Sequence, residues 1–334
     1  MRATAPAAVI TVTANPGLDL TYTLPDAIGR DVEVWRATAS TLEASGKGVN
    51  VSRALHAVGV PTCAVLPAGG PTGRYLAELL DDDHVPHRIV PQEGHTRVNT
   101  TALQPGGETV KMNGPGAALT AAEQEALLSE TRAALEDAGV RDGETWLAVS
   151  GSLPPGATAD LVTELVRLAH AHGARCAVDA SGDALQAALR AHADLLAPNR
   201  DELGEVLDIE LGRSGLHEVA DLVASVSADT GARLLISLGR HGAMYADGPR
   251  VLHATAGPLT PVNTAGAGDA LLAGWLSSTA DADSRLATAV RWGRSACLSP
   301  TTVDSRPGLR DTEPVTIERL GRAGRAGDTR PRGR

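Results

Sequence analysis

The chain has 334 residues, of which 43% are hydrophobic, and a formal net charge of −10 at pH 7. This length allows one large α/β domain with an insertion, and this hydrophobic content argues against a disordered chain. The negative charge argues against a nucleic-acid partner. Three widely separated cysteines, Cys63, Cys176 and Cys297, lack the spacing of metal ligands, so we expect reduced thiols. With no signal-peptide core and no apolar stretch of about 20 residues, we expect a cytoplasmic protein without membrane contact.

Strand-like runs alternate with helix-like runs along most of the chain. The predicted strands are 9–13, 63–66, 146–150, 175–179, 194–197 and 234–237. The predicted helices are 49–58, 73–80, 121–138, 159–172, 183–192, 200–207 and 218–230, with a further apolar helix after residue 269. Such alternation implies parallel strands, right-handed crossovers and helices on both faces of the sheet. Ligands of such a sheet bind at the carboxyl ends of its strands.

Two segments, 18–41 and 96–113, interrupt this alternation because their apolar residues alternate with polar ones and lack helical spacing. We expect them to form antiparallel strands that project from the main sheet as a small lid. The main domain is expected to span residues 1–318. The tail from 319 to 334 is rich in Arg and Gly, lacks apolar spacing and is predicted to be disordered.

The most informative segment reads Asn263-Thr264-Ala265-Gly266-Ala267-Gly268-Asp269 and leads directly into an apolar helix. Small residues let the backbone approach a ligand closely, and the unpaired N–H groups at a helix start bind anions. A carboxylate at the end of such a loop would repel a phosphate, unless it must take a proton from a hydroxyl beside that phosphate. The segment therefore predicts phosphoryl transfer to an alcohol, with Asp269 as the base.

A second glycine-rich turn, Ser45-Gly46-Lys47-Gly48-Val49-Asn50, stands directly before the first predicted helix. It is not a P-loop, because Thr41 replaces the first Gly and no Ser or Thr follows Lys47. The turn suits a polyhydroxyl or phosphorylated ligand. A third turn, Gly69–Gly73, follows the second strand. Taken alone, each turn is more typical of an ordinary connection between a strand and a helix.

The few cations near these turns indicate an anionic ligand. The only lysines are Lys47 and Lys111, and Arg36 and Arg97 lie on the predicted lid. Four cations that face one cleft require an anion between them. We therefore infer a substrate that carries its own phosphate, although Lys111 fits scattered surface charge equally well.

Seven short motifs follow one another in a characteristic order, at 45–50, 69–73, 150–156, 179–182, 198–202, 237–239 and 263–269. Chance explains any one of them but not the set. From about residue 9 to about residue 299 the chain resembles the phosphofructokinase B group of the ribokinase-like sugar kinases. The resemblance implies an α/β fold, a three-layer α/β/α sandwich with a mostly parallel central sheet and a small β-sheet lid. It also implies ATP as phosphoryl donor and Mg²⁺ as its companion ion.

The resemblance assigns roles to individual positions. Asp269 would be the catalytic base, and the backbone N–H groups of Gly266, Ala267 and Gly268 would face the transferring phosphoryl group. The sugar would be bound by Asp19, Gly46, Lys47, Asn50 and Ser150, and its existing phosphate by Arg36 and Arg97. The nucleotide would be bound by Asn199, Ser237, Gly239, Asn263 and Thr264, together with Gly266 and Gly268. Glu202, with Asn199, would place Mg²⁺ through water.

Some of these residues also have ordinary structural interpretations. Asn199 and Glu202 fit a capping box at the start of the helix 200–207, and capping is compatible with the functional role. Asp19 also fits a turn. Asp179 is interpreted as the end of a strand and is left out of the predicted site.

The chain departs from the family pattern at three positions. Ala197 stands where the family usually has Lys, which bears on nucleotide placement. Ser45 replaces a usual Gly. Asn263 stands where relatives often have Asp or Ser, so dependence on a monovalent cation stays open.

The implied function is an ATP-dependent kinase of a phosphorylated ketohexose. The first choice is 1-phosphofructokinase, since Lys47 and Val34-Trp35-Arg36 resemble that branch and the tagatose-6-phosphate kinases. The stretches 67–70 and 113–116 resemble the 6-phosphofructokinase branch as well. A kinase of an unphosphorylated sugar or nucleoside and an inactive sugar-phosphate sensor stay open as alternatives. The exposed strand edges of the lid predict a homodimer.

Overall fold

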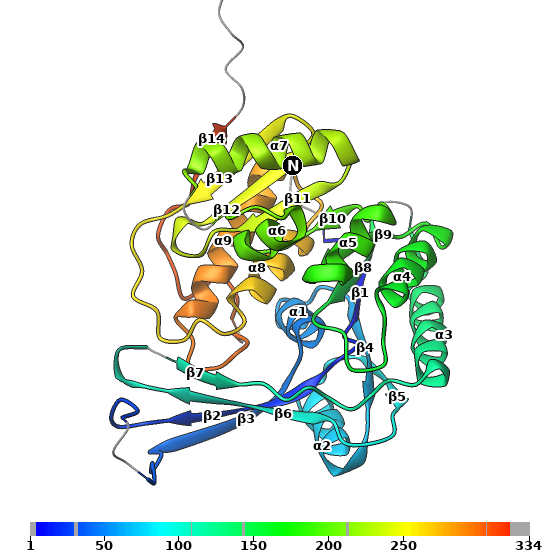
Figure 1. Cartoon of the computed structure of the whole chain (residues 1–334), viewed down its shortest axis with the longest axis vertical. Coiled ribbons are helices and arrows are strands. Elements are labelled where there is room, and N and C mark those ends of the chain that lie inside the picture. The colour runs from blue at the N-terminus through cyan, green and yellow to red at the C-terminus, as the bar shows by residue number, and fades with distance from the viewer. Residues whose placement is uncertain are drawn as a thin grey trace, which may run out of the picture.

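A mixed sheet forms the centre of the computed structural model, which describes residues 5–29, 33–107, 109–141, 144–211, 214–304 and 306–320. Within these residues the sheet has ten strands in the order β14-β13-β12-β11-β10-β9-β8-β1-β4-β5 (Figure 1). The parallel strands are β1 (Ala8–Val12), β4 (Thr62–Ala68), β5 (His87–Pro91), β8 (Thr145–Ser150), β9 (Arg175–Asp179), β10 (Leu195–Leu196) and β11 (Arg233–Ser237). The predicted α/β fold with a mostly parallel sheet is confirmed.

Helices cover both faces of this sheet, so its central strands are buried on both sides. Trp146 and Ala148 of β8 pack on one face against α1 (Lys47–His56), α8 (Ala267–Leu276) and α9 (Ala282–Cys297). Leu147 and Val149 pack on the other face. That face carries α3 (Ala121–Asp137), α4 (Ala159–Ala171), α5 (Gly182–Arg190), α6 (Arg200–Leu207) and α7 (Leu216–Thr230). None of the helices in the described ranges combines the length and the apolar character needed to cross a bilayer.

A separate four-stranded sheet forms the lid, in the order β3-β2-β6-β7 among the described residues (Figure 1). Its strands are β2 (Gly17–Thr23), β3 (Ala39–Ser45), β6 (Arg97–Leu103) and β7 (Thr109–Met112). Strands β2 and β3 are antiparallel, as are β6 and β7, but β2 and β6 run parallel. The expectation of purely antiparallel strands was therefore wrong at this central pair. The chain passes through α1, β4, α2 (Gly70–Asp82) and β5 between the two hairpins, and β6 then runs in the same direction as β2.

The root of the lid shares a hydrophobic core with the main sheet. Leu18 of β2 and Ala44 of β3 pack with Leu66 of β4 and with Leu76 and Leu80 of α2. The lid is thus anchored at the end that adjoins the carboxyl edge of the parallel strands.

The sequence analysis missed the antiparallel edge of the main sheet and the helix α9. Strands β12 (Ala243–Asp247), β13 (Arg250–Thr255) and β14 (Thr316–Leu320) extend the sheet beyond β11. Strand β14 includes Arg319 and Leu320, which were expected to be disordered. They are ordered because Leu320 is buried and pairs with Val251. The rest of the expected tail, 321–334, lies outside the described residues.

Candidate active site

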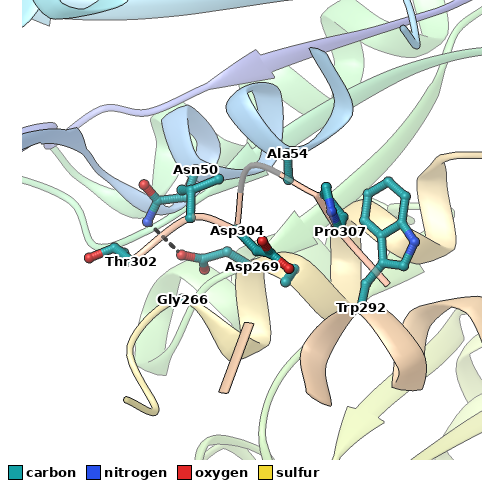
Figure 2. A pocket seen from close by; sticks show the side chains of 10 residues that line it. Asn50, Ala54, Gly266, Asp269, Trp292, Thr302, Asp304 and Pro307 are labelled. Carbon is teal, nitrogen blue, oxygen red and sulfur yellow. Dashed lines mark hydrogen bonds between the residues drawn. The ribbon is translucent and has the colours of Figure 1, made fainter. Parts of the chain in front are cut away.

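The predicted base, Asp269, lies in the first turn of α8, at the carboxyl edge of the parallel sheet. Its side chain is buried, and its Oδ2 accepts a hydrogen bond of 2.8 Å from Nδ2 of Asn50 in α1 (Figure 2). The two residues are 219 positions apart in the chain. The fold therefore brings the two glycine-rich segments into direct contact, as the assignment of both to one site requires.

The electrostatic surroundings of Asp269 raise its pKa to about 7. Burial is the main cause, and the carboxylate of Asp179 adds to it. The hydrogen bond from Asn50 and the positive charge of Lys47 act in the opposite direction. A carboxylate with a pKa near the working pH can both accept and release a proton, so Asp269 suits general base catalysis.

Gly266 precedes α8 as its N-cap residue and can only be glycine. Its φ of 75° lies in the left-handed region, and a Cβ there would lie 2.1 Å from the carbonyl oxygen of Thr302. Gly268 is exposed and a Cβ there would meet nothing within 4 Å. The first N–H groups of α8 have no partner within the helix and carry its positive dipole end. Gly266, Ala267 and Gly268 thus form an open cradle for an anion next to Asp269.

Asn263 shapes the start of this loop. Its side chain is buried, and Oδ1 accepts a hydrogen bond of 3.0 Å from the N–H of Ala265 while Nδ2 donates to the carbonyl of Pro300 at 3.4 Å. Thr264, by contrast, is exposed. Asn263 therefore fixes the backbone, and Thr264 is free to meet a ligand.

Lys47, in the glycine-rich turn 45–50, contacts two carboxylates. Its Nζ lies 2.8 Å from Oδ1 of Asp179 and 3.7 Å from Oε1 of Glu202. Burial lowers the pKa of Lys47, but the negative charges of Asp179, Glu202 and Asp269 outweigh it, so the pKa is raised. Lys47 stays protonated next to Asp269. Its neighbour Gly46 has φ 128° and leaves no room for a Cβ against Thr13.

The sequence analysis left Asp179 out of the site, and the structure places it there. It ends β9 at the carboxyl edge of the sheet, is buried, and binds Lys47. Its position as the last residue of a predicted parallel strand was the available signal, because ligands bind at that edge.

On the lid, Asp19 is held by two hydrogen bonds. Oγ of Ser45 donates to its Oδ2 at 2.6 Å, and Nδ2 of Asn99 donates to its Oδ1 at 2.9 Å. Ser45, which replaces the usual Gly, therefore has a specific contact. Asn99 was not predicted and orients Asp19 from the neighbouring strand. These bonds fix a carboxylate that still has acceptor capacity for sugar hydroxyls.

The structure separates the two predicted phosphate ligands, Arg97 and Arg36. Arg97 donates from Nη2 to the carbonyl of Asn15 at 2.7 Å and from Nη1 to that of Gly114 at 3.0 Å. Burial lowers its pKa, against the opposing charge of Asp19. Arg36 is exposed and lies beyond the last β2–β3 pair, Thr23 with Ala39. Within one chain the fold does not bring Arg36 to Asp19.

Several buried polar atoms of the described residues have no hydrogen-bond partner. Three of them belong to the predicted sugar site: Oγ of Ser150, Oδ1 of Asn50 and Nε of Arg97. A buried polar atom without a partner costs free energy of about 1–3 kcal/mol. Each of these atoms fits a polar ligand that would satisfy it.

Asn199 and Glu202 form the capping box of α6 that was predicted. Oδ1 of Asn199 accepts from the N–H of Glu202 at 2.9 Å, and Oε2 of Glu202 accepts from the N–H of Asn199 at 2.8 Å. Asn199 also forms a parallel bridge with Ser237, and Gly239 follows with φ 57°. Oε2 of Glu202 caps the helix, and its Oε1 faces Lys47. The role of Glu202 in placing Mg²⁺ stays a prediction.

Comparison with known proteins identifies this architecture. The chain matches the model of the pfkB family carbohydrate kinase over residues 18–310. It is 33% identical over 296 residues to ATP-dependent 6-phosphofructokinase isozyme 2 of Escherichia coli strain K12, covering 88% of this chain and 92% of the relative. It is also 33% identical over 301 residues to 1-phosphofructokinase of Rhodobacter capsulatus, covering 87% of this chain and 92% of the relative.

A solved structure of a phosphofructokinase is also similar to this chain. The crystal structure of phosphofructokinase-2 from Escherichia coli in complex with fructose-6-phosphate superposes with a TM-score of 0.78 and 31% identity, covering 88% of this chain and 94% of that one. The family match over residues 18–310 includes Asp269, the loop before it and nearly all of the lid. The chain therefore belongs to the pfkB family of carbohydrate kinases, and it is a phosphofructokinase-type sugar kinase whose family implies ATP as co-substrate.

Proposed function

We propose that the enzyme is a 1-phosphofructokinase, which converts fructose 1-phosphate and ATP into fructose 1,6-bisphosphate and ADP. The observation that carries the reaction is the buried Asp269 carboxylate beside the open cradle of Gly266, Ala267 and Gly268. In the reaction, the sugar hydroxyl oxygen forms a bond to the γ-phosphorus, the bond from that phosphorus to ADP breaks, and the hydroxyl proton passes to Asp269. The N–H groups of the cradle stabilise the charge on the transferring group.

The sugar phosphate is proposed to bind between the lid and the sheet edge. Asp19, held by Ser45 and Asn99, accepts hydrogen bonds from sugar hydroxyls, and a carboxylate can accept from two of them at once. The buried atoms of Ser150, Asn50 and Arg97 that have no hydrogen-bond partner would supply further donors and acceptors. Arg97 is proposed to meet the phosphate of the substrate. Lys47 in the glycine turn resembles the 1-phosphofructokinase branch and the tagatose-6-phosphate kinases, and it supports the first of these as our choice.

We further propose that the nucleotide lies along the Asn263 loop and the turn from Ser237 to Gly239. Mg²⁺ prefers oxygen ligands, keeps several waters and binds mainly through phosphates. Among the described residues no group of three acidic, His or Cys side chains could ligate the ion directly, which fits an ion held mainly by phosphates and water. Glu202, with Asn199 in the same capping box, is the proposed contact to its water shell. These two residues would hold the ion through water, and the ion would neutralise charge on the ATP phosphates.

We also propose a homodimer through the lid. Tyr22, Val98, Val110 and Met112 are exposed on the lid strands, with Met112 60% exposed. The outer strands β3 and β7 have edges that no other described strand covers. A second copy would cover both the apolar side chains and these edges. The cytoplasmic location expected from the sequence stays a prediction.

Fructose 6-phosphate is the second candidate substrate, because the chain is as similar to a 6-phosphofructokinase as to a 1-phosphofructokinase. The deciding experiment measures ADP formation with ATP and Mg²⁺ for fructose 1-phosphate, fructose 6-phosphate, tagatose 6-phosphate, fructose and a nucleoside. We expect the highest kcat/KM for fructose 1-phosphate. Preference for another sugar would overturn that choice, and binding without ADP formation would indicate a sensor.

A further inference from the structure

Glu43 of the lid strand β3 connects three parts of the molecule. It lies opposite Asp19 in the β2–β3 register, and its side chain is only 11% exposed. Its Oε2 accepts a hydrogen bond of 3.1 Å from the backbone N–H of Thr302, 259 residues further along the chain. Its Oε1 accepts from both terminal nitrogens of Arg53 at 3.4 Å. The carboxylate therefore bridges the lid, the helix α1 and the segment after α9.

Arg53 fixes one side of this bridge. Its Nη1 donates to the carbonyl of Ala44 at 3.0 Å, and its Nε donates to Oδ2 of Asp83, which follows α2, also at 3.0 Å. Its side chain is 13% exposed. Because the guanidinium is held from two other directions, the position of Glu43 is well defined.

Thr302 lies on the other side of the bridge, against the anion cradle. Its carbonyl oxygen would lie 2.1 Å from a Cβ on Gly266, so the two residues pack closely. Thr302, Gly266, Asp269 and Asn50 line one pocket (Figure 2). A shift of the Thr302 backbone therefore presses on, or withdraws from, the residue that starts α8.

We propose that Glu43 is a positioning residue that couples sugar binding at the lid to nucleotide binding at the cradle. The inference rests on the proposed kinase function. A sugar bound to Asp19 moves β2, and β3 moves with it because the two strands pair along their whole length. Glu43 carries that movement to Thr302 and so to Gly266. Such coupling is reciprocal, so each ligand tightens the binding of the other.

Calorimetry tests this coupling directly. The affinity of Mg²⁺ with a non-hydrolysable ATP analogue is measured with and without saturating sugar phosphate, using the best substrate of the panel. We expect the sugar to tighten the analogue about fivefold or more in the wild type. In Glu43→Ala the ratio should fall to one, and kcat should fall about tenfold or more, because a small misplacement of catalytic groups is costly.

Two further variants keep the test decisive. Glu43→Gln preserves the shape but has one acceptor oxygen instead of two, so it serves Arg53 or Thr302 and should give an intermediate ratio. If Glu43→Ala does not fold, the affinity ratio is measured on Glu43→Gln instead. Asp83→Ala is the matched control, because it removes a partner of Arg53 but leaves the bond from Thr302 to Glu43, and it should keep the wild-type ratio.

The two levels of the proposal fail in different ways. A wild-type enzyme that makes no ADP with any sugar phosphate would overturn the proposed function. An active wild type with a ratio of one, or folded Glu43 variants that keep the wild-type ratio, would overturn the coupling role of Glu43 alone.

Discussion

Lys47 and Asp179 form an ion pair of 2.8 Å beside the predicted base, although they are 132 residues apart. Both charges act on Asp269, in opposite directions: Asp179 raises its pKa and Lys47 lowers it. Burial is the main cause of the raised pKa of Asp269, and the two members of the pair adjust that pKa in opposite directions.

This relationship predicts opposite shifts of the pH profile in two variants. Asp269 must be deprotonated to act as a base, so kcat/KM should rise with pH and level off above about 7 in the wild type. In Lys47→Met the acid limb should move to higher pH, and in Asp179→Asn it should move to lower pH. Rates measured from pH 5 to 9 with one buffer system test this. Titration of the substrate phosphates is common to all three enzymes, so shifts in the same direction would contradict the assignment.

Removal of the base should stop turnover and spare binding. Asp269→Asn is nearly isosteric and can still contact Asn50, but cannot take the hydroxyl proton. We expect kcat to fall about 100- to 10,000-fold, with sugar-phosphate affinity nearly unchanged. Rapid-quench turnover and calorimetry on the same preparation separate the two effects. Turnover close to wild type would show that another group is the base.

The same substitution should stabilise the protein at alkaline pH. The pKa of Asp269 is raised from 3.8 to about 7, so the folded chain binds its proton more tightly than the unfolded chain between these values. Stability from this group is therefore present at low pH and is lost as pH rises through about 7. Asp269→Asn avoids the buried charge, so its free energy of unfolding at pH 8 should exceed that of the wild type by up to about 4 kcal/mol, in proportion to that pKa shift.

The gain is measured as the difference in unfolding free energy between variant and wild type at pH 4 and pH 8. It should be small at the lower pH and large at the higher one. Asp82→Asn, at an exposed position, is the control and should give the same difference at both. A pH-independent difference for Asp269→Asn would mean that the carboxylate is not destabilised by burial.

Arg97 should distinguish phosphorylated from free sugars. Its Nε has no partner, and a phosphate would supply one through a charge-assisted hydrogen bond. We expect Arg97→Ala to raise KM for fructose 1-phosphate roughly 10- to 100-fold and to affect free fructose much less. Lys111→Ala, which removes an exposed lid cation, is the control. Equal effects on both sugars would show that Arg97 only supports the backbone of Asn15 and Gly114.

The proposed dimer can be tested on the exposed lid face. Charges at Val110 or Met112 would be buried at a lid-to-lid contact, so Val110→Asp and Met112→Asp should convert the dimer to a monomer. Sedimentation velocity at micromolar concentration measures the change. Leu309→Asp, at a site 72% exposed outside the lid, should leave the mass unchanged. A wild-type monomer would refute the proposal outright.

The parallel part of the fold was predictable because its signal is local. Strands β8 and β9 are short apolar runs between helices with clear periodicity, and the prediction for β9 matched its bounds, Arg175–Asp179. Strand β14 shows the opposite case. Most of Thr316–Leu320 is polar and exposed, and only pairing with β13 makes it a strand. Alternation of apolar and polar residues reveals a strand only when one of its faces is buried. An edge strand such as β14 is mostly exposed, so its sequence lacks that pattern.

The site was predictable to the extent that its chemistry lies in compact motifs. Asp269 and Asn50 were assigned from separate turns, and the fold joins them. Asp179 and Asn99 were missed because each is a single polar residue on a strand, and only tertiary structure shows what it contacts. Arg36 was placed near the substrate on its charge, its position on the predicted lid and the family resemblance, none of which carries information about distance.

The parallel pairing of β2 with β6 sets Gly17 opposite Arg97 and Asp19 opposite Asn99. The residue proposed to bind sugar hydroxyls and the residue proposed to bind the phosphate therefore lie on two neighbouring, paired strands. Because the two strands are paired, the proposed contacts of Asp19 and Arg97 move together when the lid moves. In the proposed function, a sugar without the phosphate would contact Asp19 and leave Arg97 without its anion, so the spacing that the β2–β6 pairing sets between these residues would separate the two kinds of sugar.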